Sequence, residues 1–223
     1  MSRLDTLLIH AGQQHTDGAV VNPIFQSANF QMAGETDYGA LRYIRLNNTP
    51  NQAALSEKLS AVCGTEAALV AASGMAAITA ALLSNLKAGD HALVQSTVYG
   101  GTATFLTKDA PRMGISVTFV DTLRPETWAA ALRPETTVFY AESIANPLLS
   151  VGDLEAVVAF ARQHGLVSII DNTFCSPVNF RPASLGFDLV VHSATKYLNG
   201  HSDIVAGAVV LSLIHISEPT RQI

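Results

Sequence analysis

Short apolar segments alternate with longer helix-like segments from about residue 52 to residue 210. Several of the apolar segments are rich in β-branched residues and have Gly or Asp directly before or after them, as buried strands do. Such alternation is typical of an α/β fold in which helices cover a mainly parallel sheet. The predicted strands are Ala67–Ala71, His91–Gln95, Ile115–Val120, Thr137–Ala141, Leu166–Ile170, Leu189–His192 and Val205–Val210, and the predicted helices are Ala53–Val62, Ala76–Leu86, Thr102–Met113, Glu126–Leu132 and Leu154–His164.

Composition narrows the class of protein without naming a function. The chain has 223 residues, 48% of them hydrophobic, and a net charge of −5, which suits a globular protein with a sizeable core. No basic patch indicates nucleic acid, no apolar run is long enough for a membrane span, and residues 1–5 lack the apolar core of a signal peptide. Cys63 and Cys175 are too few for a disulfide framework or a metal site. We therefore expect a cytoplasmic protein without a metal.

Lys196 is the first candidate for chemistry. It lies in the stretch His192-Ser193-Ala194-Thr195-Lys196-Tyr197, directly after a predicted strand. An amine at the end of a buried strand can form a Schiff base with a carbonyl, and neighbouring hydroxyls can bind a phosphate. These are the requirements of pyridoxal phosphate (PLP). Taken alone, the stretch is equally consistent with a structural lysine.

Asp171 ends the apolar run Leu166–Ile170 and faces the crevice in which parallel sheets bind ligands. In a PLP site a carboxylate there would pair with the pyridine nitrogen and keep it protonated, so that the ring accepts electrons. The alternative is an Asp that only caps the following turn. Lys196 further along the chain favours the cofactor interpretation.

A glycine turn between a predicted strand and a predicted helix, Ser73-Gly74-Met75, is a candidate phosphate cradle. Glycine lets the backbone approach an anion closely, and the free amides at a helix start favour phosphate. Tyr99 follows the next predicted strand and could stack on the pyridine ring, although ordinary packing would explain it too.

Together these motifs resemble the Cys/Met-metabolism group of fold-type I PLP-dependent enzymes, from Leu7 to Val210. The group includes cystathionine γ-synthase, cystathionine γ- and β-lyase, methionine γ-lyase and the O-acylhomoserine sulfhydrylases. The most specific match runs from Asp188 through Ser193-Ala194-Thr195-Lys196-Tyr197 to Asp203. The resemblance implies a fold-type I transferase with a mainly parallel seven-stranded sheet flanked by helices.

The resemblance also implies a role for each matched residue. Lys196 would carry PLP and move protons on the substrate, and Tyr99 would stack on the ring and assist proton transfer. Asp171 would pair with the ring nitrogen. For the phosphate, the cofactor-binding positions are Gly74, Met75, Ser193 and Thr195. Asn146 would approach the ring hydroxyl, and Thr173 and Glu142 would line the same pocket. The alternative for Thr173 and Glu142 is that they are structural polar residues at strand ends.

Tyr43 and Arg45 match a Tyr-x-Arg that, in this group, reaches the cofactor phosphate of a neighbouring subunit. A guanidinium suits phosphate because it can bind it in a bidentate way. The implied assembly is a homodimer or homotetramer with shared active sites. A surface arginine beside a packed tyrosine is the alternative.

Three regions are expected along the chain. Residues 1–50 are polar with little periodicity and are predicted to form an extended arm against a partner subunit, and residues 51–210 form the PLP-binding domain. Residues 211–223 resemble the translation of a sequencing-library adapter. We therefore expect a fragment that lacks the family's C-terminal small domain, and with it the arginine that binds the substrate carboxylate.

The function implied by the resemblance is transsulfuration at Cγ of cystathionine or an activated homoserine. O-acetylhomoserine sulfhydrylase is the nearest alternative. Methionine γ-lyase is less favoured, because its members usually carry a cysteine where this chain has Gly101. A different class of interpretation is a catalytically inactive fragment.

Overall fold

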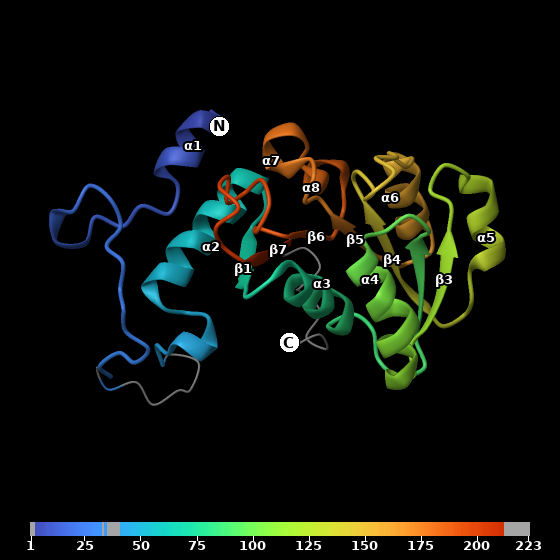
Figure 1. The fold of residues 1–223 in the computed structure, drawn as a ribbon, viewed down its shortest axis with the longest axis horizontal. Coiled ribbons are helices and arrows are strands. Elements are labelled where there is room, and N and C mark those ends of the chain that lie inside the picture. The colour runs from blue at the N-terminus through green and yellow to red at the C-terminus, as the bar shows by residue number, and fades with distance from the viewer. Residues whose placement is uncertain (1–2, 33, 35–40, 212–223) are drawn as a thin grey trace.

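A seven-stranded sheet forms the centre of the computed structural model, which describes residues 3–32, 34 and 41–211 (Figure 1). The strand order is β1-β7-β6-β5-β4-β2-β3. The strands are β1 (Ala67–Ala71), β2 (His91–Gln95), β3 (Ser116–Val120), β4 (Thr136–Glu142), β5 (Val167–Asp171), β6 (Leu189–His192) and β7 (Gly207–Leu211).

Six of the strands run in one direction. The pairs β2–β3, β2–β4, β4–β5 and β5–β6 are parallel, whereas β7 lies antiparallel between β1 and β6. The predicted mainly parallel seven-stranded sheet is therefore confirmed. Because β7 is the one reversed strand, the carboxyl ends of the other six meet at one edge, the edge at which β7 begins.

The helices connect the strands and mostly match the predicted ones to within a few residues. Thr49 and Gln52 form a capping box at the start of α2, and Gly64, with φ 73°, ends it. The α-helices are α1 (Leu4–His10), α2 (Pro50–Cys63), α3 (Gly74–Leu83), α4 (Gly100–Thr104), α5 (Trp128–Ala131), α6 (Leu154–Gln163), α7 (Ser176–Asn179) and α8 (Pro182–Leu185), and shorter turns are η1 (Thr16–Gly18), η3 (Ile44–Leu46), η4 (Phe105–Asp109), η5 (Ala110–Met113) and η6 (Pro125–Thr127).

Two hydrophobic layers cover the sheet, one on each face. Val138 and Tyr140 of β4 pack into the layer formed with α3, α4 and η4, whereas Phe139 and Ala141 pack into the layer formed with α2, α5 and α6. Side chains of a strand alternate between faces, so each central strand contributes to both layers. This arrangement explains why the central strands read as continuous apolar runs.

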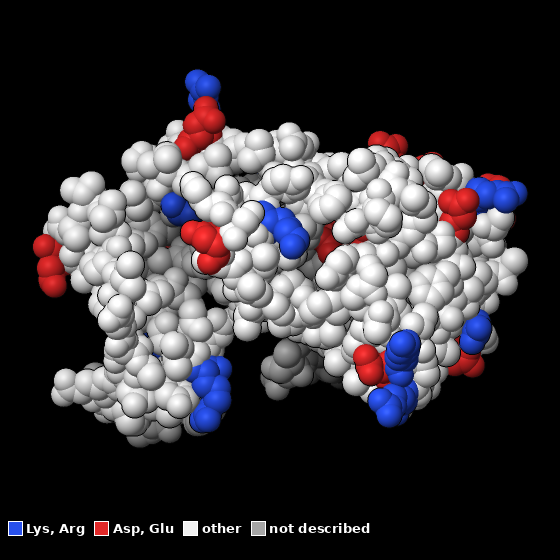
Figure 2. Space-filling model, viewed as in Figure 1, with Lys and Arg blue, Asp and Glu red and all other residues white. Residues whose placement is uncertain are grey.

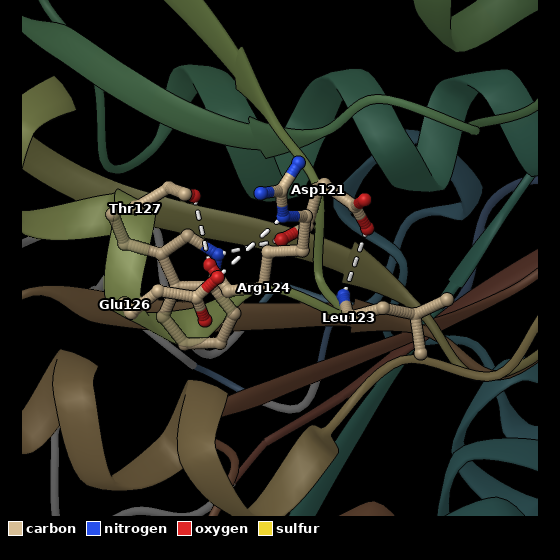
Figure 3. A network of polar contacts seen from close by, with 6 residues as sticks. Asp121, Leu123, Arg124, Glu126 and Thr127 are labelled. Carbon is tan, nitrogen blue, oxygen red and sulfur yellow. Dashed lines mark hydrogen bonds and ion pairs between the residues drawn. The ribbon is translucent and has the colours of Figure 1, made fainter.

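The turn after β3 is fixed by polar contacts to backbone carbonyls (Figure 3). The Trp128 indole donates to the Asp121 carbonyl at 2.7 Å, and Thr127 donates its amide and its hydroxyl to the Arg124 carbonyl at 3.0 and 2.7 Å. The Arg124–Glu126 ion pair, at 3.5 Å, is exposed and contributes little. Trp128 is thereby held in the core beneath α6.

The predicted helix Thr102–Met113 is an α-helical turn, a π-helical segment and a 3₁₀ segment in succession: α4, η4 and η5. Pro111 has no amide to donate, so a regular α-helical ladder cannot continue through it. The spacing of apolar and polar residues does not distinguish these helix types, so the sequence predicted one continuous helix.

The N-terminal arm contains a helix, α1, that the sequence did not predict. The arm lies beside α2, apart from the sheet (Figure 1), and the Lys58 ammonium donates to the Leu8 and Ile9 carbonyls at 3.0 and 3.1 Å. These contacts satisfy carbonyls at the end of α1 that have no partner within the helix. Residues 212–223, which contain nearly all of the predicted adapter-derived tail, lie outside the described residues, while Leu211 is the last residue of β7.

Within the described part of the chain, none of the helices combines the length and apolar character that a membrane span requires. Charged side chains are scattered over the face shown in Figure 2 and do not form an extended basic patch there.

Candidate functional site

A cavity of about 260 Å³ opens at the sheet edge where the parallel strands end. It receives residues from the segments that follow β1, β2, β4, β5 and β6 and from the segment that precedes β7. Its lining residues are Ser73, Gly74, Met75, Ile78, Tyr99, Glu142, Ile144, Asn146, Asp171, Thr173, Phe174, Ser193, Thr195, Lys196 and Val205.

The start of α3 presents free amides to this cavity. The Ser73 hydroxyl accepts the Ala76 amide at 3.0 Å. The amides of Gly74 and Met75 lie in the first turn of α3 and therefore have no acceptor inside the helix. A Cβ on Gly74 would lie 2.6 Å from the Ser193 hydroxyl oxygen, so only glycine allows this close approach. Two amides, a helix N-terminus and a hydroxyl therefore surround one point, which suits a phosphate group.

Asp171 ends β5 with its side chain at the cavity. Oδ1 accepts the amide and the hydroxyl of Thr173, at 2.9 and 2.5 Å, and the Thr173 hydroxyl in turn accepts the Ser193 amide at 2.8 Å. Oδ2 has no hydrogen-bond partner among the described residues. Burial raises the pKa of Asp171, while the hydroxyl and amide of Thr173 lower it. A cation placed against Oδ2 would satisfy this carboxylate.

Lys196 lies in the turn after β6 and lines the cavity. Its ammonium forms no hydrogen bond or ion pair with another described residue, so it is available to a ligand. The Thr195 hydroxyl is differently placed: it donates to the Ala206 carbonyl at 3.1 Å and accepts the Ala206 amide at 3.0 Å. Thr195 can bind an anion only by giving up its bond to the carbonyl, whereas Ser193 has no such commitment among the described residues.

Tyr99 precedes α4, and 46% of the residue is exposed. The ring lies against Gly101, where a Cβ would come within 2.5 Å of the Tyr99 Cε1 atom and 3.0 Å of the Met75 sulfur. The absence of a side chain at Gly101 thus allows this position of the ring beside the cavity.

Buried titratable groups lie beneath the site. Burial raises the pKa of Tyr140 well above its usual value, and it lowers the pKa of His192 to about 4. Burial also raises the pKa of the Cys63 thiol to about 12. These three groups are therefore neutral near pH 7 and belong to the core rather than to the cavity surface.

Tyr43 and Arg45 do not line the cavity of their own chain. The Arg45 guanidinium carbon lies 4.9 Å from the centre of the Tyr43 ring, and the side chain of Arg45 is exposed. The other ten residues predicted for the site, Glu142 included, all line it. Ser73, from the predicted glycine turn, lines the cavity too. The sequence did not indicate the remaining lining residues, because apolar residues at a cavity cannot be told from core residues by pattern: Ile78, Ile144, Phe174 and Val205.

The chain matches a known protein family and several of its members. The family model for Cys/Met metabolism PLP-dependent enzymes matches residues 5–222. A probable cystathionine gamma-synthase of Herpetosiphon aurantiacus is 43% identical over 209 residues, which cover 93% of this chain and 65% of that protein. An L-methionine gamma-lyase of Porphyromonas gingivalis is 44% identical over 225 residues, or 96% of this chain and 56% of that protein.

A solved structure of a family member has the same fold. The crystal structure of cystathionine gamma-lyase from Lactobacillus plantarum complexed with L-serine superposes with a TM-score of 0.91 at 36% identity, covering 97% of this chain and 57% of that one. The chain thus spans between about half and two thirds of the length of these relatives. The cofactor of the family is pyridoxal phosphate. By sequence match and by fold, the chain belongs to the Cys/Met metabolism PLP-dependent enzymes.

Proposed function

We propose that this chain carries the cofactor half of an enzyme that acts at Cγ of cystathionine or an activated homoserine, as a cystathionine γ-synthase or γ-lyase does. The observation that supports the proposal most is the convergence of Lys196, Asp171 and the Gly74–Met75 amides on one cavity. An amine, an acceptor for a ring cation and an anion cradle are the three features that PLP requires. The cytoplasmic location remains a prediction.

In this proposal each residue has a separate task. The Lys196 amine would bind the cofactor, and its Nζ would remove the α-proton of the substrate. Asp171 Oδ2 stabilises the positive charge on the ring nitrogen, and Gly74, Met75 and Ser193 bind the phosphate, with Thr195 after its hydroxyl is released. When bound, pyridoxal phosphate supplies an electron sink for the charge that develops on the substrate.

Three further assignments complete the site. Tyr99 stacks on the ring and passes a proton to the leaving group, Asn146 approaches the ring hydroxyl, and Thr173 orients Asp171. The Thr173 contact to Asp171 supports the last of these. The lining positions of Tyr99 and Asn146 support the other two.

The substrate is tested by assaying the PLP-loaded chain with three substrate sets. Cystathionine and water should give cysteine, ammonia and 2-oxobutanoate. Turnover only of O-acetylhomoserine with sulfide would favour the sulfhydrylase instead, and turnover of methionine alone would favour a methionine γ-lyase. Bound cofactor without any turnover would support the interpretation as an inactive fragment.

Gly101→Ala is expected to weaken PLP binding by about two- to tenfold, because one aromatic stacking contact contributes an affinity of that size. The new Cβ would displace the Tyr99 ring, which can rotate because it is partly exposed. Equilibrium titration with PLP measures the effect. Gly100→Ala is a matched control, since a Cβ there meets nothing within 4 Å. Equal affinity of the two variants would contradict the role of the Tyr99 ring.

Arg45→Ala is expected to reduce PLP retention at least about tenfold, because a bidentate contact with a phosphate is lost. We propose that Arg45, with Tyr43, reaches the site of a second copy in a homodimer or homotetramer. The exposure of Arg45, and its absence from the lining of the cavity in its own chain, support this assignment. PLP retention after dialysis is the measurement, and the neighbouring exposed Arg42→Ala serves as the control. Unchanged retention in Arg45→Ala would show that the cross-subunit role is wrong.

A further inference from the structure

Glu142, at the end of β4, is a buried carboxyl group that forms no ion pair with another described residue. Only 4% of the residue is exposed, and its Cα is in register with that of Asp171 on β5. Burial raises the pKa of Glu142 to about 8; the Tyr99 amide lowers it, the charge of Asp171 raises it and the Asn146 amide lowers it. Burying such a group is unfavourable unless its oxygens are hydrogen-bonded.

Both oxygens of Glu142 accept backbone amides from the cavity wall. Oε1 accepts the Tyr99 amide at 2.6 Å, and Oε2 accepts the Asn146 amide at 3.4 Å. The Glu142 amide donates to Gln95 Oε1 at 3.0 Å, and the Gln95 side-chain amide donates to Thr97 in the same loop as Tyr99. One side chain therefore joins the loop after β2 to the loop after β4.

The two residues that Glu142 contacts both line the cavity, and each comes from a different loop. Loops have few backbone bonds of their own, so a buried acceptor that binds both determines where their side chains lie. The Tyr99 ring also rests against Gly101, which restricts the ring but not the backbone. Glu142 supplies the missing backbone restraint.

We propose that Glu142 is a positioning residue that holds Tyr99 and Asn146 at the cofactor cavity through their backbone amides. This proposal rests on the proposed function, in which both residues face bound PLP. Its role is indirect: the carboxyl group of Glu142 orients the two residues and does not itself contact the ring. The neighbouring Asp171, by contrast, has an oxygen free for the ligand.

The test compares Glu142→Leu, Glu142→Gln and Ser143→Ala. Ser143 is adjacent and equally buried, and its hydroxyl donates to the Asp171 carbonyl at 3.3 Å without contacting Tyr99 or Asn146. In the cofactor-free chain, amide hydrogen exchange of Tyr99 and Asn146 should be at least about tenfold faster in Glu142→Leu than in Ser143→Ala. Glu142→Gln, which fills the same volume and keeps one oxygen acceptor, should retain slow exchange at Tyr99 and lose it at Asn146.

The loaded protein provides a second readout that a purely structural role would not alter. Glu142→Leu should weaken PLP binding about tenfold and reduce the circular dichroism of bound PLP, with partial recovery in Glu142→Gln and wild-type values in Ser143→Ala. Unchanged exchange, or faster exchange with unaltered affinity and dichroism, would overturn the proposal. Failure of the wild-type chain to bind PLP would instead contradict the proposed function, and the exchange result would still report on the contacts of Glu142.

Discussion

Lys196→Ala is expected to abolish the visible absorbance of PLP bound to the protein and to reduce any turnover at least about a thousandfold. The variant loses the amine that binds the cofactor and the base that moves the α-proton, and general acid–base catalysis alone contributes about 10²- to 10⁴-fold. Absorbance after dialysis measures the first effect. Borohydride reduction of the wild-type protein, followed by mass spectrometry, should place the cofactor label on the peptide that contains Lys196.

Two controls make this result specific to Lys196. Lys196→Arg keeps the positive charge but cannot form the covalent bond, so it should behave like the alanine variant. Lys87→Ala removes an exposed lysine in the loop after α3 and should leave the absorbance unchanged. A reduced label on any other lysine would disprove the assignment.

The second large effect is expected for Asp171→Asn, which should weaken PLP binding without lowering the stability of the cofactor-free protein. The asparagine can still accept the Thr173 bonds through its oxygen, and no charge is buried. The free energy of unfolding without cofactor should therefore stay equal or increase. PLP should bind about 10- to 100-fold more weakly, because the ring cation loses its charged partner. Chemical denaturation with and without PLP measures both.

A variant that is merely destabilised serves as the control. Asp153 caps α6 by accepting the Ala156 amide at 2.9 Å and does not line the cavity. Asp153→Asn or Asp153→Ala should therefore lower stability by about 1 kcal/mol or less without altering PLP affinity. If Asp171→Asn lowered stability in the free protein and left PLP affinity intact, the carboxylate would be a structural residue instead.

Much of the fold could be predicted from local pattern. The strand Leu189–His192 was predicted with the bounds that the structure has, and Leu166–Ile170 differs from β5 by one residue at each end. Buried parallel strands are easy to predict from sequence because both of their faces pack against apolar residues, so they appear as continuous apolar runs. The helix α1 was missed, because its seven residues are too few for the spacing of Leu4, Leu7 and Leu8 to establish a helical period, and none of them is buried.

The residues of the candidate site could also be predicted from the positions of the strands. Lys196, Asp171 and Gly74 each follow a predicted strand, and in a parallel sheet the ends of the strands meet at one edge. Polar residues at those ends are thus brought together by the topology alone. Glu142 and Gln95 lie at strand ends too, but the bond between them depends on the pairing of β2 with β4, and no local pattern specifies that neighbour.

The sequence by itself determined the order of most strands and helices, because periodicity and turn residues are local properties, and its motifs identified the family and most of the polar residues that meet at the cavity. Only the tertiary structure decided which strands are neighbours. The insertion of β7 between β1 and β6 brings Gly74 against Ser193, residues more than a hundred positions apart. Contacts of this kind depend on the packing of the whole sheet, in which each strand's position is set by all the others.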